Sequence, residues 1–103
     1  MKKRLSLCEG RHNIPGVEGH IYPRIVKDPT DLVGLASTAQ EELKDCTELD
    51  LFVTGLSVAL TTVIRYCADH GIPLTLYHYD KLTGEYFRQP MANPKLDKTD
   101  HFP

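Results

Sequence analysis

The sequence has 103 residues, of which 41% are apolar and 25% charged, and its formal net charge is −2 at pH 7. This length suffices for one domain with a modest core. The weak negative charge disfavours a binder of duplex nucleic acid, and no run of 18 apolar residues is present to predict a membrane partner.

The start of the chain is basic, but polar residues interrupt its apolar part after a few positions. A signal peptide needs a longer apolar region, so we expect a cytoplasmic protein. Cys8, Cys46 and Cys67 share no short spacing, which predicts small buried thiols and neither a disulfide framework nor a metal site. No cofactor motif is visible.

The first half of the chain predicts a strand, a loop and a helix. Residues 4–10 alternate apolar and polar side chains, as a half-buried strand does, and the Gly- and Pro-rich residues 10–19 predict a loop. Residues 20–26 predict a short extended segment that Pro23 confines to an edge or a bulge. Asp28 as the cap and Pro29 predict a helix that ends near Asp45. Its predicted apolar stripe is Leu32, Leu35, Ala36, Ala39 and Leu43.

The second half predicts a strand, a helix and a hairpin. Residues 49–55 are nearly all apolar, which favours a central parallel strand buried on both faces. Residues 57–70 predict a helix capped by Gly71. Residues 72–80 and 85–90 predict two strands joined by a turn, the second antiparallel to the first.

These elements predict an α/β fold, a small Rossmann-like three-layer sheet in the order β-α-β-α-β-β with an antiparallel edge hairpin. Residues 1–90 form the predicted single domain. We expect the polar residues 91–103 to be disordered or to lie across a partner subunit.

The junction between residues 49–55 and the following helix is the best candidate for an anion site. Ligands of open α/β sheets bind beyond the carboxyl ends of the strands. There Gly55 allows close approach of a ligand, Thr54 and Ser57 add hydroxyl groups, and the helix N-terminus favours negative charge. Arg11, at the end of the first strand, suits a phosphate. The alternative is that Ser57 only caps the helix and Gly55 only eases the turn.

Aromatic side chains gather in the predicted hairpin, where Tyr77 and Tyr79 share one face and His78 lies on the other. Together with Tyr86 and Phe87 they suit either a platform for base stacking or a subunit interface. Both interpretations hold if a ligand lies between subunits.

Catalytic equipment is sparse. Nothing in the spacing requires a triad of Ser57, His12 and Asp80, and the glycine spacing of a dinucleotide fingerprint is absent. Glu9 and His12 remain an alternative acid/base pair for phosphodiester cleavage.

Three stretches together, "LCEGRHNIPGVEGHIYP", "LDLFVTGLSVAL" and "IPLTLYHYDKLTGEYF", resemble the phage Thoeris anti-defence proteins of the first type, the signal-sequestering "sponge" family. The resemblance spans about Leu7 to Gln89. It implies a non-enzymatic protein that binds, without degrading it, the cyclic ADP-ribose isomer made by a bacterial TIR-domain enzyme. It also implies a homo-oligomer, dimeric or higher, and in some members a separate site for cyclic oligonucleotides.

Residue roles follow from the resemblance alone. Tyr79 is the implied stacking partner of the adenine, and Gln89 is an implied polar contact. The residues implied to meet the pyrophosphate or the riboses are Arg11, His12, Thr54 and Ser57. His20 and Arg24 are implied for the second site. Two alternatives stay open: a ring nuclease that cleaves a cyclic oligonucleotide, and an interaction module without a small ligand.

Overall fold

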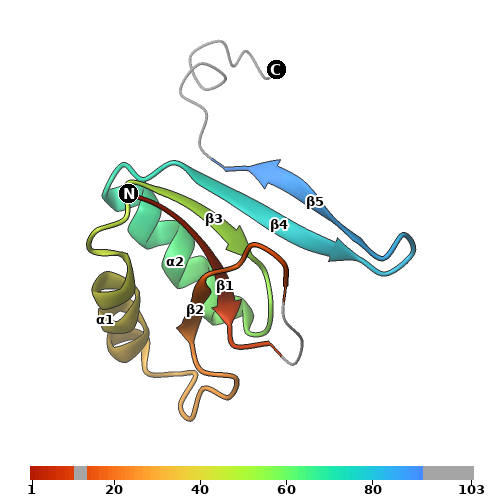
Figure 1. The fold of residues 1–103 in the computed structure, drawn as a ribbon. Helices are drawn as coiled ribbons and strands as arrows, with labels where there is room; N and C mark the ends of the chain where they lie inside the picture. Colours follow the sequence, from red (N-terminus) through yellow and green to blue (C-terminus); the bar gives the residue numbers. More distant parts are fainter. Residues whose placement is uncertain (11–13, 92–103) are drawn as a thin grey trace, which may run out of the picture.

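The computed structural model describes residues 1–10 and 14–91, and Figure 1 shows their course. They form five strands and two helices: β1 (Lys2–Cys8), β2 (Gly19–Tyr22), α1 (Leu32–Leu43), β3 (Glu48–Phe52), α2 (Ser57–Asp69), β4 (Leu74–Asp80) and β5 (Glu85–Pro90). Among these residues, no helix is long and apolar enough to cross a membrane.

All five strands join one mixed sheet in the order β2-β1-β3-β4-β5. The first four strands are parallel, and β5 pairs antiparallel with β4. The α/β class and the antiparallel edge hairpin are therefore confirmed, and the arrangement is compatible with a Rossmann-like fold. Residues 19–22 form β2 at the edge beside β1, which corresponds to the short extended segment predicted at residues 20–26, although the predicted element order did not count it as a strand. β2 ends directly before Pro23, which has no N–H to donate.

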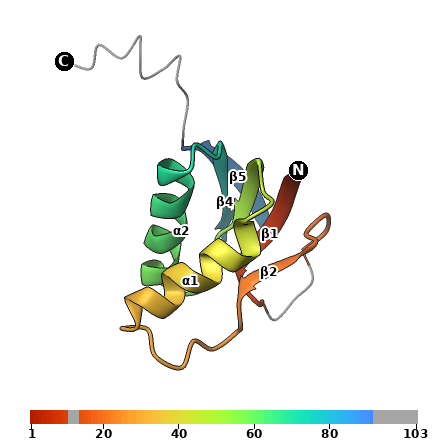
Figure 2. The ribbon, with the colours of Figure 1, turned by 90° about the vertical axis from the view of Figure 1, so that its left-hand side faces the viewer.

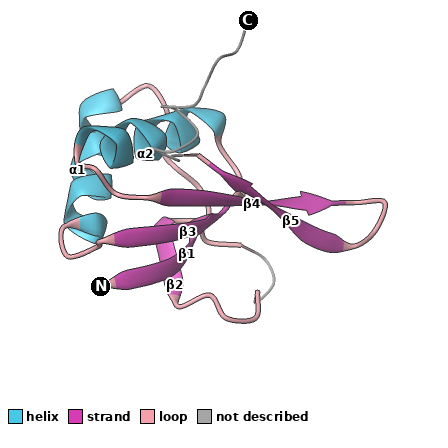
Figure 3. Ribbon diagram, turned by 90° about the horizontal axis from the view of Figure 1, so that it is seen from above, coloured by secondary structure: helices cyan, strands magenta, loops and turns pink. Residues whose placement is uncertain are grey.

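The layering differs from the expected three layers, because both helices lie on the same face of the sheet (Figures 2 and 3). The connection from β2 to β3 and the connection from β3 to β4 cross the sheet in the same direction. Right-handed crossovers in one direction place their helices on one face. Residues 14–18 lie on the opposite face, where the Gly16 carbonyl oxygen accepts a hydrogen bond from Arg4 Nε at 3.2 Å.

The core lies between this sheet and the two helices. Leucines at alternate positions of β1, β3 and β4 pack against three buried residues of each helix: Leu35, Ala39 and Leu43 of α1, and Ala59, Val63 and Cys67 of α2. All three cysteines are buried free thiols, so the prediction that they are buried is confirmed.

The start of α1 differs from the prediction. Asp31, not Asp28, is the N-cap and accepts a hydrogen bond from the Gly34 N–H at 3.0 Å. Asp28 instead accepts hydrogen bonds from the backbone and the hydroxyl of Thr30, which forms a turn before the helix. Leu32 of the predicted stripe consequently lies in the exposed first turn.

Candidate functional site

The best candidate site is a pocket of about 540 Å³, which we call the turn pocket. It lies where the connection from β2 to α1 meets the turn from β3 to α2. The turn contributes three consecutive residues and the connection contributes four, with Cys8 of β1 between them; the lining is Cys8, Arg24, Ile25, Val26, Pro29, Gly55, Leu56 and Ser57. The pocket therefore lies beyond the carboxyl ends of β1 and β3, where open α/β sheets bind ligands.

The turn is shaped by contacts with the end of β1. Gly55 has φ +86°, in the left-handed region that favours glycine. A Cβ atom at this position would lie 3.1 Å from Cys8 Sγ and 3.3 Å from Cys8 Cβ. Glycine is thus required by both the backbone angle and the packing of Cys8.

Thr54 is tied to the same residue. Its hydroxyl donates a hydrogen bond to the Cys8 carbonyl oxygen at 2.8 Å and accepts one from the Cys8 N–H at 3.1 Å. The single hydroxyl proton is therefore used inside the fold. Thr54 therefore links the turn to β1 through two hydrogen bonds, whereas the resemblance implies that it contacts a ligand.

Positive electrostatic potential converges on the turn pocket from two sources. The N-cap of α2 is Leu56, which provides no side-chain hydrogen bond to the helix, so its first N–H groups face the turn without a side-chain cap. Ser57 is the first residue of the helix and is exposed, so it does not act as the cap. Arg24 lines the same pocket, and its Nη2 donates to the Gly10 carbonyl oxygen at 3.3 Å.

The aromatic hairpin lies apart from this pocket. Tyr79, 53% exposed, lies edge-on to Tyr86 on the face of the sheet opposite the helices. The same face carries Phe52, which stacks on Tyr77 with ring centroids 4.6 Å apart. Tyr79 does not belong to the lining of the turn pocket, so the structure does not bring the predicted stacking residue and the predicted anion turn to one rim within a chain.

Gln89 lies on the other face of the hairpin from Tyr79. Its Oε1 is 2.7 Å from His78 Nε2, and it pairs in register with the core residue Leu76. Arg11 and His12, the two remaining residues implied for the pyrophosphate, lie outside the described residues.

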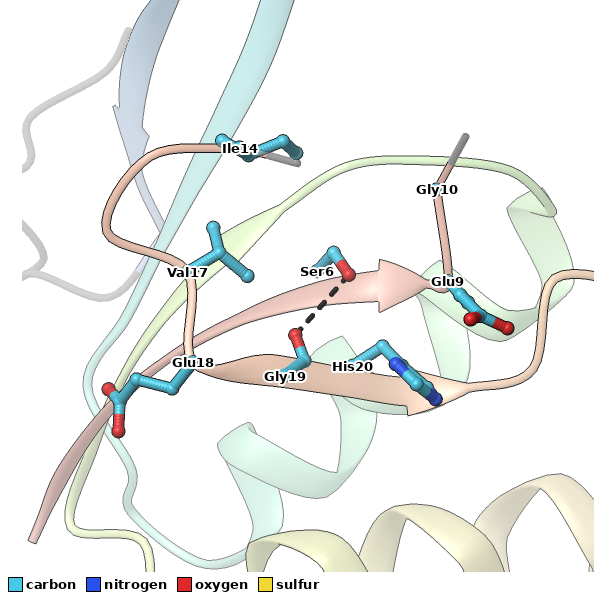
Figure 4. A pocket seen from close by; sticks show the side chains of 8 residues that line it. All are labelled: Ser6, Glu9, Gly10, Ile14, Val17, Glu18, Gly19 and His20. Carbon is cyan, nitrogen blue, oxygen red and sulfur yellow. Dashed lines mark hydrogen bonds between the residues drawn. The ribbon is translucent and has the colours of Figure 1, made fainter. Parts of the chain in front are cut away.

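A second pocket, of about 300 Å³, lies on the helix-free face between β1, β2 and the loop that joins them (Figure 4). His20 lines it together with Glu9 and Glu18, and Ser6 Oγ donates to the Gly19 carbonyl oxygen at 3.4 Å on its floor. The two carboxylates make the described lining unfavourable for a phosphate. Arg24 belongs to the turn pocket, so the structure separates the two residues implied for a second nucleotide site.

The described residues provide little catalytic or metal-binding machinery. No group of three or more His, Cys, Asp and Glu residues gathers in residues 1–10 and 14–91 in a way that could hold a metal ion. Asp80, the acid of the triad considered from the sequence, accepts a hydrogen bond from the Leu82 N–H in the hairpin turn.

Sequence reasoning missed the role of Arg24 in the turn pocket. Arg24 is 31 positions from Gly55, and the two meet only because β2 lies beside β1 in parallel. The one local signal is Pro23, which ends β2 and directs the next residues away from the sheet edge.

No protein-family model, no curated protein and no solved structure matches this chain. The geometry of the described residues therefore carries the functional argument.

Proposed function

We propose that this protein is a non-enzymatic binder of a small nucleotide-type anion, and that the turn pocket is its site. One observation carries the proposal: the N-terminus of a 13-residue helix without a side-chain cap opens into a pocket that the Arg24 guanidinium also lines. Helix N-termini and arginine guanidinium groups both suit phosphate groups, the first through free N–H groups and the helix dipole and the second through paired hydrogen bonds.

The size and composition of the pocket support a ligand larger than a single phosphate. Its volume of about 540 Å³ falls within the range of small-molecule sites. Ile25, Val26 and Leu56 supply an apolar wall beside the charged end. A ligand with one anionic part and one less polar part, such as a nucleotide, fits this division.

The finer proposal rests on the sequence resemblance. It names a cyclic nucleotide immune signal, a cyclic ADP-ribose isomer and in addition cyclic oligonucleotides, which the protein sequesters in the bacterial host cytoplasm and so blocks anti-phage defence. It also includes assembly into a homo-oligomer, dimeric or higher. Sequestration needs no bond cleavage, and the turn pocket has no acid/base pair in its described lining.

Thermal unfolding with a panel of cyclic nucleotides, cyclic ADP-ribose among them, tests the proposal. A ligand present at 100 times its Kd adds about 2.7 kcal/mol of apparent stability. The bound ligand should be recovered intact after heat denaturation. Recovery of a cleaved product would favour the ring nuclease, and no shift with any nucleotide would favour the module without a ligand.

Two pairs of variants localise the binding. Arg24→Gln removes a positive charge from the pocket lining and should weaken binding at least 10-fold. The matched control is Arg65→Gln, which removes an exposed arginine of α2 that pairs with Asp69 and should leave binding unchanged. Ser57→Pro keeps the helix, because proline suits the first helical position, but removes one free N–H. It should weaken binding more than Ser57→Ala, which removes only the hydroxyl. Equal affinities across these variants would place the ligand elsewhere.

A further inference from the structure

We propose that β5 pairs antiparallel with β5 of a second copy of this chain, about a two-fold axis that passes beside Phe87. This inference specifies the surface for the oligomer in the proposed function. The resulting assembly would be one continuous ten-stranded sheet.

The register of the hairpin determines which backbone groups of β5 face outward. The Met91 N–H donates to the Leu74 carbonyl oxygen at 2.8 Å, and the carbonyl oxygen of Tyr77, opposite Arg88, accepts from the N–H of Val53, the residue after β3, at 2.9 Å. Antiparallel pairs alternate between hydrogen-bonded and non-hydrogen-bonded, so odd-numbered residues of β5 bond to β4. The N–H and C=O groups of Tyr86 and Arg88 consequently point away from the sheet.

These two residues match each other across a two-fold axis. When Phe87 lies opposite its own copy, Tyr86 faces Arg88 of the second chain as a hydrogen-bonded pair, and the reciprocal pair forms by symmetry. Each of the two Tyr86–Arg88 pairs then forms two backbone hydrogen bonds between the chains. Pro90, which has no N–H, falls at the end of the paired segment, where its missing donor interrupts nothing.

The side chains are also self-complementary in this register. Tyr86 and Arg88 lie on the helix-free face, so each tyrosine ring meets a guanidinium of the partner, a favourable cation–π arrangement. On the other face, Phe87, 54% exposed, would pack against its copy, and Glu85 would lie opposite Gln89. No like charges oppose each other in this arrangement.

The edge is accessible. The β4–β5 hairpin projects beyond the rest of the sheet and beyond both helices (Figures 1 and 3). In the described part of the chain, β5 is the last strand of the sheet, and five of its six residues are exposed. The opposite edge, β2, is only four residues long and is followed directly by Pro23, so it is protected against such pairing.

The first test is the molar mass of the ligand-free protein by light scattering over a range of concentrations. We expect a species of twice the 11.6 kDa of one chain. Arg88→Pro removes an outward N–H without breaking a bond to β4, and Phe87→Asp places two like-charged side chains opposite each other at the axis, on Cα atoms about 4.5 Å apart. Each should weaken the dimer at least 10-fold, while Leu82→Asp in the exposed hairpin turn should not.

Disulfide cross-linking tests the register itself. The variant Phe87→Cys places its thiol opposite its own copy and should form a cross-linked dimer on mild oxidation, because the pair has the Cα separation of a disulfide. Glu85→Cys and Gln89→Cys should each form no cross-linked dimer alone. A mixture of the two proteins should form one, because position 85 of one chain lies opposite position 89 of the other. The native cysteines are all buried, so the unmodified protein gives the background level of cross-linking.

Three results would overturn the inference: a monomer at all concentrations, a dimer that Arg88→Pro and Phe87→Asp leave intact, or efficient linking of Glu85→Cys to itself. Because no nucleotide is present, these outcomes are independent of ligand binding. A monomer that still binds a cyclic nucleotide would reject this interface and retain the anion site.

Discussion

At the scale of single residues, the turn between β3 and α2 combines two functions. Thr54 and Gly55 act within the fold, since both are fitted to Cys8 at the end of β1. Ser57 and Arg24 are exposed and directed to the pocket lining. Structural and ligand-binding roles are thus divided between neighbouring residues of one short motif.

Replacing Thr54 with valine tests this division. Valine has nearly the same shape but leaves the Cys8 N–H and C=O without their partner, so Thr54→Val should reduce the free energy of unfolding by about 1–3 kcal/mol. Thr54→Ser keeps the hydroxyl and should lose less. Urea unfolding measures both, and equal losses would show that packing, rather than the two hydrogen bonds, makes Thr54 important.

At the scale of elements, the ends of the helices determine where the pocket opens. α1 begins only after the turn made by Asp28 and Thr30, so the connection from β2 is long enough to reach the start of α2. Tyr22 joins the same parts, because its hydroxyl donates to the Leu35 carbonyl oxygen at 2.7 Å. The wall of the pocket is therefore held to the helix layer at both ends.

The two aspartates before α1 should contribute unequally to stability. Asp31→Ala removes the N-cap hydrogen bond to Gly34 and should cost about 1 kcal/mol. Asp28→Ala removes only bonds within an exposed turn and should cost less. Helix content by circular dichroism and urea unfolding report the difference. A larger loss for Asp28→Ala would mean that the turn, not the cap, determines where α1 starts.

At the scale of the whole molecule, the sheet is covered by helices on one face only. The other face keeps Asp50, 4% exposed, in an ion pair with Arg4 at 2.9 Å, and the Arg4 guanidinium lies 5.2 Å from the Phe52 ring centroid. This face therefore combines a partly buried ion pair with a half-exposed aromatic surface. Its outer edge is the strand that we assign to self-association.

Burial also predicts how stability changes with pH. Burial disfavours the charged form of Tyr22, and the charge of a Cys8 thiolate would disfavour it further. Together these effects raise the pKa of Tyr22 from its ordinary 10.0 to about 12. For Cys67 the same two effects, burial first and then the nearby Cys46, raise the pKa from 9.0 to about 12. The unfolded chain releases both protons at lower pH than the folded chain does, so the free energy of unfolding should fall as pH rises from about 9 to about 12.

The variant Cys67→Ala removes one of these groups and should flatten the loss that begins near pH 9, at the expense of some packing at neutral pH. Urea unfolding between pH 7 and pH 11 measures the slope. An unchanged slope in the variant would assign the alkaline loss to other groups.

Local patterns predicted the elements well. The alternation in residues 4–10, the apolar run before Gly55 and the hairpin signals around residues 80–84 all correspond to strands or turns of the structure. These features depend on contacts close in sequence. The cap of α1 was mispredicted because Asp28 and Asp31 both suit a helix start, and only the hydrogen bonds distinguish them.

Part of the candidate site was likewise predicted from local sequence patterns, and part was not. The turn at Thr54, Gly55 and Ser57 was visible from the sequence, because a strand, a glycine and a helix start follow one another directly. The remote positions of Tyr79 and Gln89 on opposite faces, and the entry of Arg24 into the pocket, were not predicted. Sequence spacing identifies the two strands of the hairpin as neighbours, but it does not show which of the other strands lie side by side.

By itself, then, the sequence determined the α/β class, the antiparallel hairpin and the glycine turn, since backbone preferences and apolar periodicity act over a few residues. Only the tertiary structure decided that both helices cover one face, that Thr54 hydrogen-bonds to Cys8 and that Arg24 lines the turn pocket. The order of the strands decides these features, because it sets the direction of each crossover and places β1 between β2 and β3, and that order depends on contacts between strands far apart in the chain.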